Sequence, residues 1–232
     1  MPAANLPPLF ARLPAELVPL FDPAAPWALL GEPLGRLLAE LPSSAIEGQL
    51  DPGAQILGDR IVISAGARVH AGAVIEGPVF LGRDAQVLPG AYLRGGVWLG
   101  EGAKVGANTE IKRAVFLPRA RAPHLNYVGD SILGAGVNLG AGTILANFRH
   151  DGADIEIPVA GGRLATGRRK LGAVLGDNVK TGCNAVLYPG VVVGRETRIY
   201  PGVQLRSGVY PAGRIVKLRQ ELEIVERQDS AP

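Results

Sequence analysis

The sequence predicts an all-β solenoid, in which short strands coil turn upon turn around one axis. Glycine contributes 32 of the 232 residues and aromatic residues only 5%, a composition that suits many short strands and tight turns better than a helical bundle. Aliphatic residues also recur at every sixth position. Counted from residue 57, eleven successive positions hold Leu, Ile or Val: Leu57, Ile63, Val69, Ile75, Leu81, Val87, Leu93, Leu99, Val105, Ile111 and Leu117.

A sixfold spacing has a specific structural meaning. Neither the 3.6-residue period of a helix nor the two-residue alternation of an ordinary strand produces it. It indicates short strands with one inward aliphatic side chain per six residues and small residues at the corners. Three such units form a triangular coil of about 18 residues, and successive coils stack at roughly 4.8 Å. Strands of a β-sandwich vary in length and do not hold one phase over eleven repeats, so we exclude that fold.

The repeat is interrupted twice. It slips across residues 118–126, and a charge-rich segment at 149–170 keeps no sixfold pattern at all. Long unpatterned loops are usually functional or mobile. The inward positions after the slip are Tyr127, Leu133, Leu139, Leu145, Leu175, Thr181, Leu187, Val193, Ile199 and Leu205.

Both ends of a solenoid need caps, because each coil buries its aliphatic residues only against its neighbours. Residues 14–41 mix helical apolar spacing with prolines, so we expect residues 1–50 to form a helical cap over the first coil. The solenoid then spans residues 51–212, with the excursion 149–170. In the tail, 213–232, one helical face carries Ile215, Leu218, Leu222 and Val225. This pattern predicts a C-terminal helix over residues 213–228, closing the last coil or packing on a neighbouring subunit.

Charge, cysteine content and the N-terminal sequence limit the classes of function. The formal net charge of +3 is too small and too scattered to indicate nucleic-acid binding. The single Cys183 excludes an internal disulfide and fits a reducing compartment. The proline-broken N-terminus resembles neither a signal peptide nor a membrane span. We therefore expect a cytoplasmic protein that acts on neither nucleic acid nor membrane.

The repeat places two basic residues one above the other. Arg94 and Lys112 are 18 residues apart and each follows an inward aliphatic residue, so their backbones should lie about 5 Å apart on one face. Two neighbouring cations repel unless an anion lies between them. They are either a solvated pair neutralised by acidic neighbours such as Glu110 or Glu101, or a clamp for a phosphate or carboxylate.

His124 lies where the repeat slips, so we expect its backbone to bulge out of the coil. A lone histidine is more often structural than catalytic. Here, however, Tyr127 follows three residues later, with Asn138 and Asn147 further along the chain. A protruding loop that carries these polar residues beside stacked cations is a candidate site.

Other motifs carry less information. The glycine-rich run "GAGVNLGAG" is not a dinucleotide-binding fingerprint, because no strand-to-helix unit surrounds it. A zinc site is not expected, since His70, His124 and His150 are far apart in sequence. Cys183 occupies a repeat position where any small residue suffices, and no base lies beside it in the sequence, so it is interpreted as a packing residue.

Several motifs together resemble a known family. The stretches "AYLRGG", "EIKRA", "HLNYVGD", "VNLGAGT" and "ANF" are similar to the acetyltransferase domain of the bifunctional N-acetylglucosamine-1-phosphate uridyltransferase/glucosamine-1-phosphate acetyltransferase. The resemblance covers roughly residues 51–210. It implies a left-handed parallel β-helix that works as a homotrimer and uses acetyl-CoA as co-substrate without a metal.

The resemblance also implies roles for individual residues. His124 matches the catalytic base, and Asn147 matches an active-site asparagine near the acetyl group. Arg94 and Lys112 match the basic residues that bind phosphate and sugar. Residues of the sugar site correspond to Tyr127 and Asn138. The acetyl-CoA site corresponds to Ala141 and Cys183.

The sequence departs from the family pattern in three respects. No uridyltransferase domain is present, because residues 1–50 are too short to hold it. The family's "NYDG" reads "NFRHDG" here, with Phe148 in place of the tyrosine and two residues inserted. The lysine that follows this motif in the family is missing. Arg149, or the run Arg168, Arg169 and Lys170, are candidates to replace its phosphate contact.

Three functions are consistent with these observations. The first is an acetyl-CoA-dependent N-acetyltransferase that acts on an amino-sugar 1-phosphate within nucleotide-sugar biosynthesis, with His124 as the general base. The second is an acyltransferase that moves an acyl chain from acyl carrier protein to a nucleotide sugar. The third is a non-catalytic trimeric partner of a separate sugar nucleotidyltransferase. The close match around "EIKRA" and "VNLGAG" favours the first.

Overall fold

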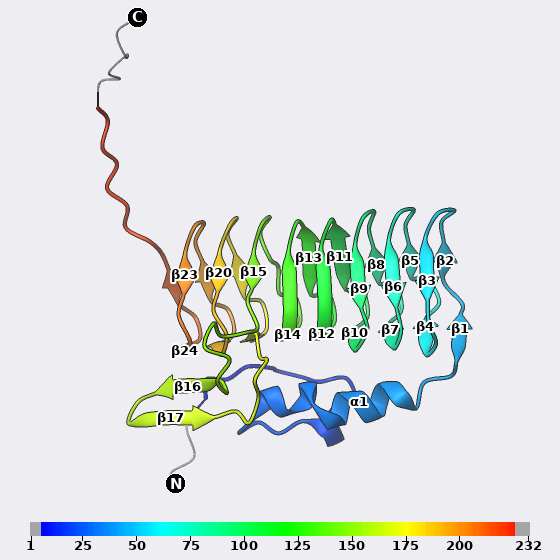
Figure 1. The fold of residues 1–232 in the computed structure, drawn as a ribbon, viewed down its shortest axis with the longest axis horizontal. Coiled ribbons are helices and arrows are strands. Elements are labelled where there is room, and N and C mark those ends of the chain that lie inside the picture. The colour runs from blue at the N-terminus through cyan, green and yellow to red at the C-terminus, as the bar shows by residue number, and fades with distance from the viewer. Residues whose placement is uncertain (1–5, 226–232) are drawn as a thin grey trace, which may run out of the picture.

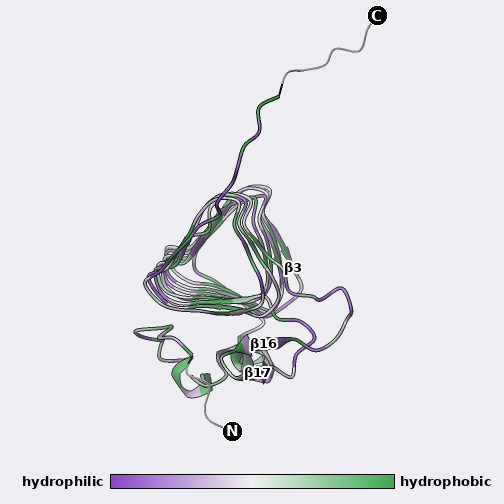
Figure 2. Ribbon diagram, turned by 90° about the vertical axis from the view of Figure 1, so that its left-hand side faces the viewer, coloured by the Kyte–Doolittle hydropathy of each residue, from purple (hydrophilic) through white to green (hydrophobic). Residues whose placement is uncertain are grey.

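The computed structural model describes residues 6–225 and contains a parallel β-solenoid of about ten turns, as the sequence predicts. The turns stack side by side along one axis, and a helical N-terminal segment runs beside them (Figure 1). Viewed along the axis, the solenoid has a triangular outline (Figure 2). Within residues 6–225, no helix is long and apolar enough to cross a membrane.

Three flat faces make up the triangle. The first face is formed by β3 (Gln55–Leu57), β6 (Val74–Glu76), β9 (Tyr92–Arg94), the first halves of β12 (Glu110–Phe116) and β14 (Tyr127–Leu133), β15 (Ile144–Leu145), β20 (Val186–Leu187) and β23 (Gln204–Leu205). The second face contains β1 (Ser44–Ile46), β4 (Ile61–Ile63), β7 (Val79–Leu81), β10 (Val97–Leu99), the second halves of β12 and β14, β18 (Ala173–Leu175), β21 (Val191–Val193) and β24 (Gly208–Tyr210). The third face contains β2 (Gln49–Leu50), β5 (Arg68–Val69), β8 (Gln86–Val87), β11 (Lys104–Ala107), β13 (Arg121–His124), β19 (Lys180–Thr181), β22 (Arg198–Ile199) and β25 (Ile215–Val216).

Strand pairing shows that the solenoid begins before residue 51. β1 pairs with β4, and β2 pairs with β5, both in parallel. The predicted boundary between cap and solenoid therefore divides strands that belong to one coil.

The interior of the triangle is filled by the inward residues of the repeat. Every predicted position from Ile63 to Ile111 is buried in the central cluster. Leu57 is an exception at 44% exposed, and Ile56 packs against the core in its place. The cause is a longer first coil, since Ile56 pairs with Ile75, 19 residues further on.

The slip in the repeat lies earlier than the sequence indicates. Leu93 pairs with Ile111, 18 residues on, whereas Val97 pairs with Ala114, only 17 residues on. One residue is therefore missing at the corner around residue 113, and not across residues 118–126.

The shorter corner changes which side chains face inward. The preceding coil turns through two glycines in the left-handed conformation, Gly95 and Gly96, where this coil turns through Arg113 alone. Phe116 consequently fills the interior in place of Leu117, which packs in the cluster outside the second face. In the next coil the core position belongs to Val128 and not to Tyr127.

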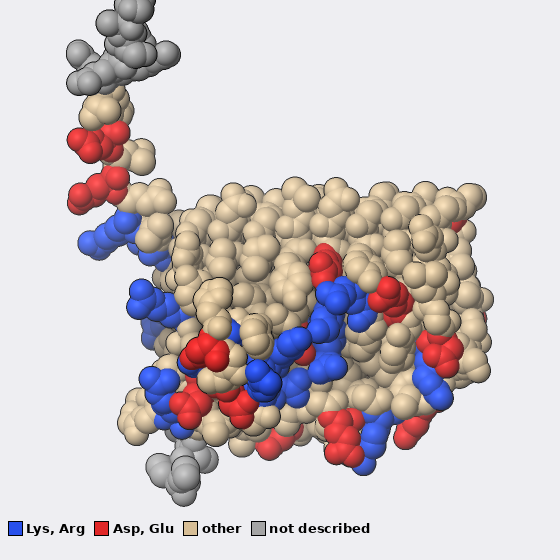
Figure 3. Space-filling view, in the orientation of Figure 1, with Lys and Arg blue, Asp and Glu red and all other residues tan. Residues whose placement is uncertain are grey.

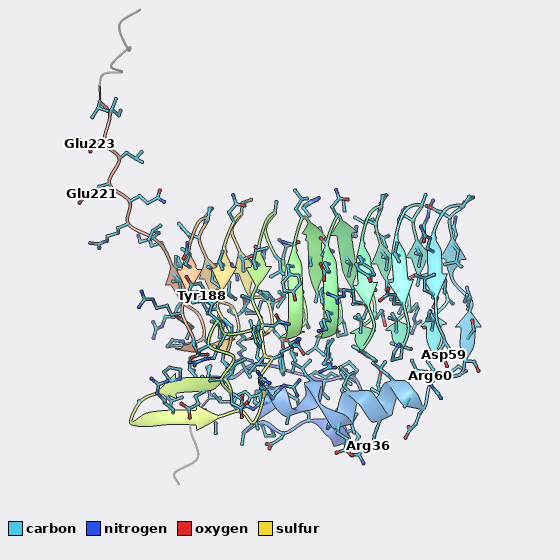
Figure 4. The ribbon with its side chains drawn as sticks, in the orientation of Figure 1. Arg36, Asp59, Arg60, Tyr188, Glu221 and Glu223 are labelled. Carbon is cyan, nitrogen blue, oxygen red and sulfur yellow. The ribbon has the colours of Figure 1, made fainter. Side chains whose placement is uncertain are left out.

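The N-terminal segment packs along the second face instead of covering the first coil. Its 3₁₀ helices η1 (Val18–Leu20) and η2 (Pro26–Leu30) lead into the α-helix α1 (Glu32–Ala39). Leu34 and Leu38 of α1 are buried in a second apolar cluster that includes Trp98 and Ile132 of the second face. Arg60 secures the end of α1 by hydrogen bonds to the backbone carbonyls of Ala39 and Leu41 (Figure 4).

The excursion forms a β-hairpin beside the cap. It leaves after Phe148 and returns at Lys170, and these two residues form an antiparallel bridge. Between them β16 (Glu156–Val159) pairs with β17 (Gly162–Ala165). Ile157 is buried in the second apolar cluster, and Ser207 Oγ donates to the Glu156 carbonyl at 3.3 Å. The hairpin thus lies against the last coils of the second face and leaves the first face open (Figure 1).

The predicted C-terminal helix is absent from residues 213–225, and residues 226–228 lie outside the described residues. After β25 the chain leaves the solenoid without regular structure, carrying Glu221 and Glu223 away from it (Figure 4). Leu222 is 87% and Ile224 96% exposed. The physical reason is that a short amphipathic helix is marginal in water unless its apolar face packs on a partner.

Phe116→Ala should destabilise the solenoid by about 3–5 kcal/mol, because it leaves a cavity where the register shifts. The midpoint of chemical denaturation measures this change. Val18→Ala, at a side chain that is 57% exposed, is the matched control and should change stability by no more than about 0.5 kcal/mol. A Phe116→Ala protein as stable as this control would contradict the assignment of Phe116 to the core.

Candidate functional site

Arg94 and Lys112 lie in register on the first face. Each follows one member of the buried pair Leu93 and Ile111, so they occupy equivalent places in adjacent coils, as the repeat predicts. Their environments differ. Arg94 Nη1 lies 2.7 Å from Glu110 Oε1, so this cation does have an acidic neighbour. For Lys112, burial and the nearby Lys170 ammonium lower the pKa, and the ion pairs among residues 6–225 include none that involves it.

Further cations gather around this pair. The basic patch, as we name it, consists of Arg94, Lys112, Arg113, Arg168, Arg169 and Lys170. In Figure 3 a band of positive charge crosses the middle of the molecule, between the solenoid and the cap. Arg113 is at a corner of the solenoid, and the last three residues come from the end of the excursion.

Two adjoining cavities open onto the basic patch. One, of about 630 Å³, is lined by Arg94 and Lys112 on the solenoid and by Leu34 and Leu38 of α1. The other, of about 530 Å³, is lined by Phe148 and by residues 167–170 of the excursion. Arg113 and Arg168 line both cavities, so these two guanidinium groups mark the boundary between them.

A hydrogen-bonded group of polar side chains lies next to the basic patch. The Asn147 amide Nδ2 donates to Asp130 Oδ2 at 2.6 Å, and the Tyr127 hydroxyl donates to Asn147 Oδ1 at 3.4 Å. Burial, together with the nearby Glu110 and Asp130 carboxylates, raises the pKa of the Tyr127 phenol. Tyr127 is therefore a neutral hydrogen-bonding group near neutral pH. Sequence reasoning missed Asp130, although it lies in the quoted motif "HLNYVGD".

His124 does not bulge from the coil, contrary to the expectation from the sequence. It is the last residue of β13 and pairs in register with Ala107 of β11. The slip that suggested a bulge is located at the Arg113 corner instead. The His124 side chain is nevertheless exposed, because it lies at the corner between the third and first faces.

The predicted coenzyme residues continue this corner along the solenoid. Gly142 N donates to the His124 carbonyl, and Asn184 N donates to the Ala141 carbonyl. His124, Ala141 and Cys183 therefore hold equivalent positions in three successive coils. This corner column, as we name it, is separated from the basic patch by the width of the first face.

Asn138 lies apart from the other sugar-site candidates. It forms parallel bridges with Arg121 and Lys180 on the third face, and it lines a separate cavity of about 320 Å³ there. A single chain therefore brings together Arg94, Lys112, Tyr127 and Asn147, places His124, Ala141 and Cys183 at the adjoining corner, and leaves Asn138 on another face.

This arrangement offers three kinds of chemistry. The basic patch can hold an anion such as a phosphate. The Tyr127 hydroxyl and the Asn147 amide can hydrogen-bond a polar ligand. The exposed imidazole of His124 can accept a proton.

Comparison with known proteins places the chain among hexapeptide-repeat transferases. Residues 78–113 and 172–207 match the family model "Bacterial transferase hexapeptide (six repeats)". A bifunctional sugar-1-phosphate nucleotidylyltransferase/acetyltransferase from Sulfurisphaera tokodaii is 46% identical over 104 residues, which are 45% of this chain and 26% of the relative. The bifunctional protein GlmU of Methanococcus maripaludis strain C7 is 37% identical over 124 residues, 53% of this chain and 30% of the relative.

The chain thus spans less than a third of the length of these relatives. Among solved structures, a mutant of AntD, an N-acyltransferase from Bacillus cereus in complex with dTDP and coenzyme A, is 13% identical. The match covers 84% of this chain and 89% of AntD with a TM-score of 0.35, a similarity too low to support a functional inference.

Anion binding to the basic patch should weaken with rising pH below the range where an ordinary lysine titrates. The pKa of Lys112 is lowered, so its ammonium loses the proton, and with it the attraction for an anion, at a pH below about 10.4. Sulfate, which stays ionised, is a suitable probe, and its stabilising effect on thermal unfolding can be followed from pH 7 to pH 10. Lys112→Arg should make this effect nearly independent of pH. Equal pH profiles in the two proteins would exclude Lys112 as the titrating group.

Proposed function

We propose that this chain, a hexapeptide-repeat transferase similar to the acetyltransferase part of bifunctional sugar-phosphate enzymes, is an acetyl-CoA-dependent N-acetyltransferase of an amino-sugar 1-phosphate. The observation that carries the proposal is the stacking of Arg94 and Lys112 beside the Tyr127–Asn147 pair. It provides a phosphate site and a polar sugar site on one face.

The acceptor phosphate binds in the basic patch. Arg94 and Lys112 approach it from the solenoid, and Lys170 approaches from the end of the excursion. We propose that Lys170 replaces the lysine that the family carries after its "NYDG" motif. The effect of Lys170 on the Lys112 pKa supports this, because two ammonium groups this close repel unless an anion bridges them.

His124 is the proposed general base. The amino nitrogen attacks the thioester carbonyl, a C–N bond forms, and the C–S bond breaks to release coenzyme A. His124 takes the proton from the attacking amine and returns it to the leaving sulfur. The second N–H of the Asn147 amide, or a nearby backbone N–H, faces the oxyanion of the tetrahedral intermediate.

We also propose that the protein acts as a homotrimer and that acetyl-CoA lies along the groove between adjacent solenoids. The corner column supports this placement, because His124, Ala141 and Cys183 form a continuous exposed line beside which an extended pantetheine arm fits. Asn138, on the third face, would then contribute to a site shared between subunits.

His124→Ala should lower kcat for acetyl transfer to glucosamine 1-phosphate by about 100-fold or more, because the attacking amine loses its proton acceptor. Release of coenzyme A is the measurement, with galactosamine 1-phosphate as a second acceptor. His150→Ala, in the exposed part of the excursion, is the control and should retain full activity. If the His124→Ala protein is as active as the control, His124 has no part in the reaction.

Lys170→Ala should raise KM for the sugar phosphate about tenfold and leave kcat nearly unchanged, because it removes a contact that is equal in ground state and transition state. Steady-state kinetics with saturating acetyl-CoA measure both parameters. Arg163→Ala, on the exposed hairpin, is the matched control for loss of a cation from the excursion. An unchanged KM would show that another residue takes the place of the missing family lysine.

A further inference from the structure

We propose that Asp130 is a positioning residue of the site: it sets the orientation of the Asn147 amide and withholds two guanidinium groups from the bound anion. The inference rests on the proposed function for its kinetic consequence. Its electrostatic consequence can be tested without any turnover.

Asp130 is a fully buried carboxylate at the point where three segments meet. Its neighbours come from the Arg113 corner, from Asn147 at the start of the excursion and from Arg168 at its end. Lys112 pairs with Gly129 and Ala114 with Ser131, so Arg113 and Asp130 hold equivalent corner positions in adjacent coils. Both have a left-handed backbone, with φ of 45° and 43°.

The first function of Asp130 follows from its contact with Asn147. An ionised carboxylate only accepts hydrogen bonds, so it admits the NH₂ side of the amide and rejects the carbonyl side. Asp130 Oδ2 therefore keeps Nδ2 toward itself and leaves Asn147 Oδ1 for the Tyr127 hydroxyl. The pair packs over Gly129, where a Cβ atom would come within 2.6 Å of Asn147 Nδ2 and 2.8 Å of the Tyr127 hydroxyl. The bare backbone there permits the arrangement.

The second function concerns charge. Asp130 Oδ1 accepts no hydrogen bond and is inaccessible to solvent, yet Arg113 Nη1 lies 3.7 Å and Arg168 Nη2 3.8 Å away. One carboxylate is thus shared by two guanidinium groups that both line the cavities of the basic patch. By attracting them, Asp130 reduces the positive potential available to a ligand and leaves Lys112 and Lys170 as the freer cations.

A buried aspartate with a purely structural function looks different in the same molecule. Asp177 accepts hydrogen bonds from the backbone N–H groups of Ala11 and Ala135, both at 2.7 Å, and so ties the N-terminal segment to the second face. Both of its oxygens are satisfied by backbone donors. Asp130, by contrast, contacts only side chains of the candidate site.

The test compares Asp130→Asn with Asp177→Asn. Loss of the buried charge should tighten binding of inorganic phosphate roughly three- to tenfold, because Arg113 and Arg168 become free to attract it. The same substitution should lower kcat for acetyl transfer roughly tenfold, because an asparagine at this position accepts either orientation of the Asn147 amide. Asp177→Asn should lower the melting temperature and leave both phosphate binding and kcat unchanged.

A double-mutant cycle with Asn147→Ala identifies the partner. In an Asn147→Ala background, Asp130→Asn should cause no further loss of kcat, yet it should still tighten phosphate binding. Additive losses of kcat, or phosphate binding that is unchanged or weaker in Asp130→Asn, would overturn the proposal. If the wild type transfers no acetyl group, the proposed function fails, and phosphate titration alone then decides whether Asp130 withholds the guanidinium groups.

Discussion

The structure depends on the parallel hydrogen bonding of each coil to the next. Because every strand pairs in register with the strand one coil away, a side chain is placed directly above the residue 17 or 18 positions earlier. The aliphatic interior, from Ile63 to Ile111, follows from this stacking. So does the alignment of Arg94 with Lys112, and that of His124 with Ala141 and Cys183. The register that stabilises the core therefore also arranges the polar groups outside it.

The candidate site lies where this regularity is broken. One residue is missing at the Arg113 corner, so a charged side chain occupies the turn that two glycines make in the preceding coil. In the following coil the equivalent corner is Asp130, which is buried only because the excursion and the cap close over it. Regular coils elsewhere bury aliphatic residues and leave few polar groups next to one another. A local irregularity is what allows a carboxylate, an amide and two guanidinium groups to meet.

Electrostatics links the solenoid to the two segments packed against it. Arg168 bonds the Leu30 carbonyl of the cap and the Lys170 carbonyl of the excursion, while its guanidinium faces Asp130. Burial lowers the pKa of Arg168, as expected for a cation that is only partly compensated. The cap and the excursion, which the repeat does not include, thereby help to define the cavities in which we propose that the acceptor phosphate binds.

Sequence alone determined the solenoid, its inward residues and the stacking of Arg94 on Lys112, because a strict period converts directly into geometry. It also indicated the excursion at 149–170 and the polar residues Tyr127 and Asn147. Only the tertiary structure decided the exact place of the slip, the position of the cap along the second face, the absence of a helix in residues 213–225, and the convergence of Asp130, Arg113 and Arg168. These features depend on contacts between segments far apart in the chain, and no local period records such contacts.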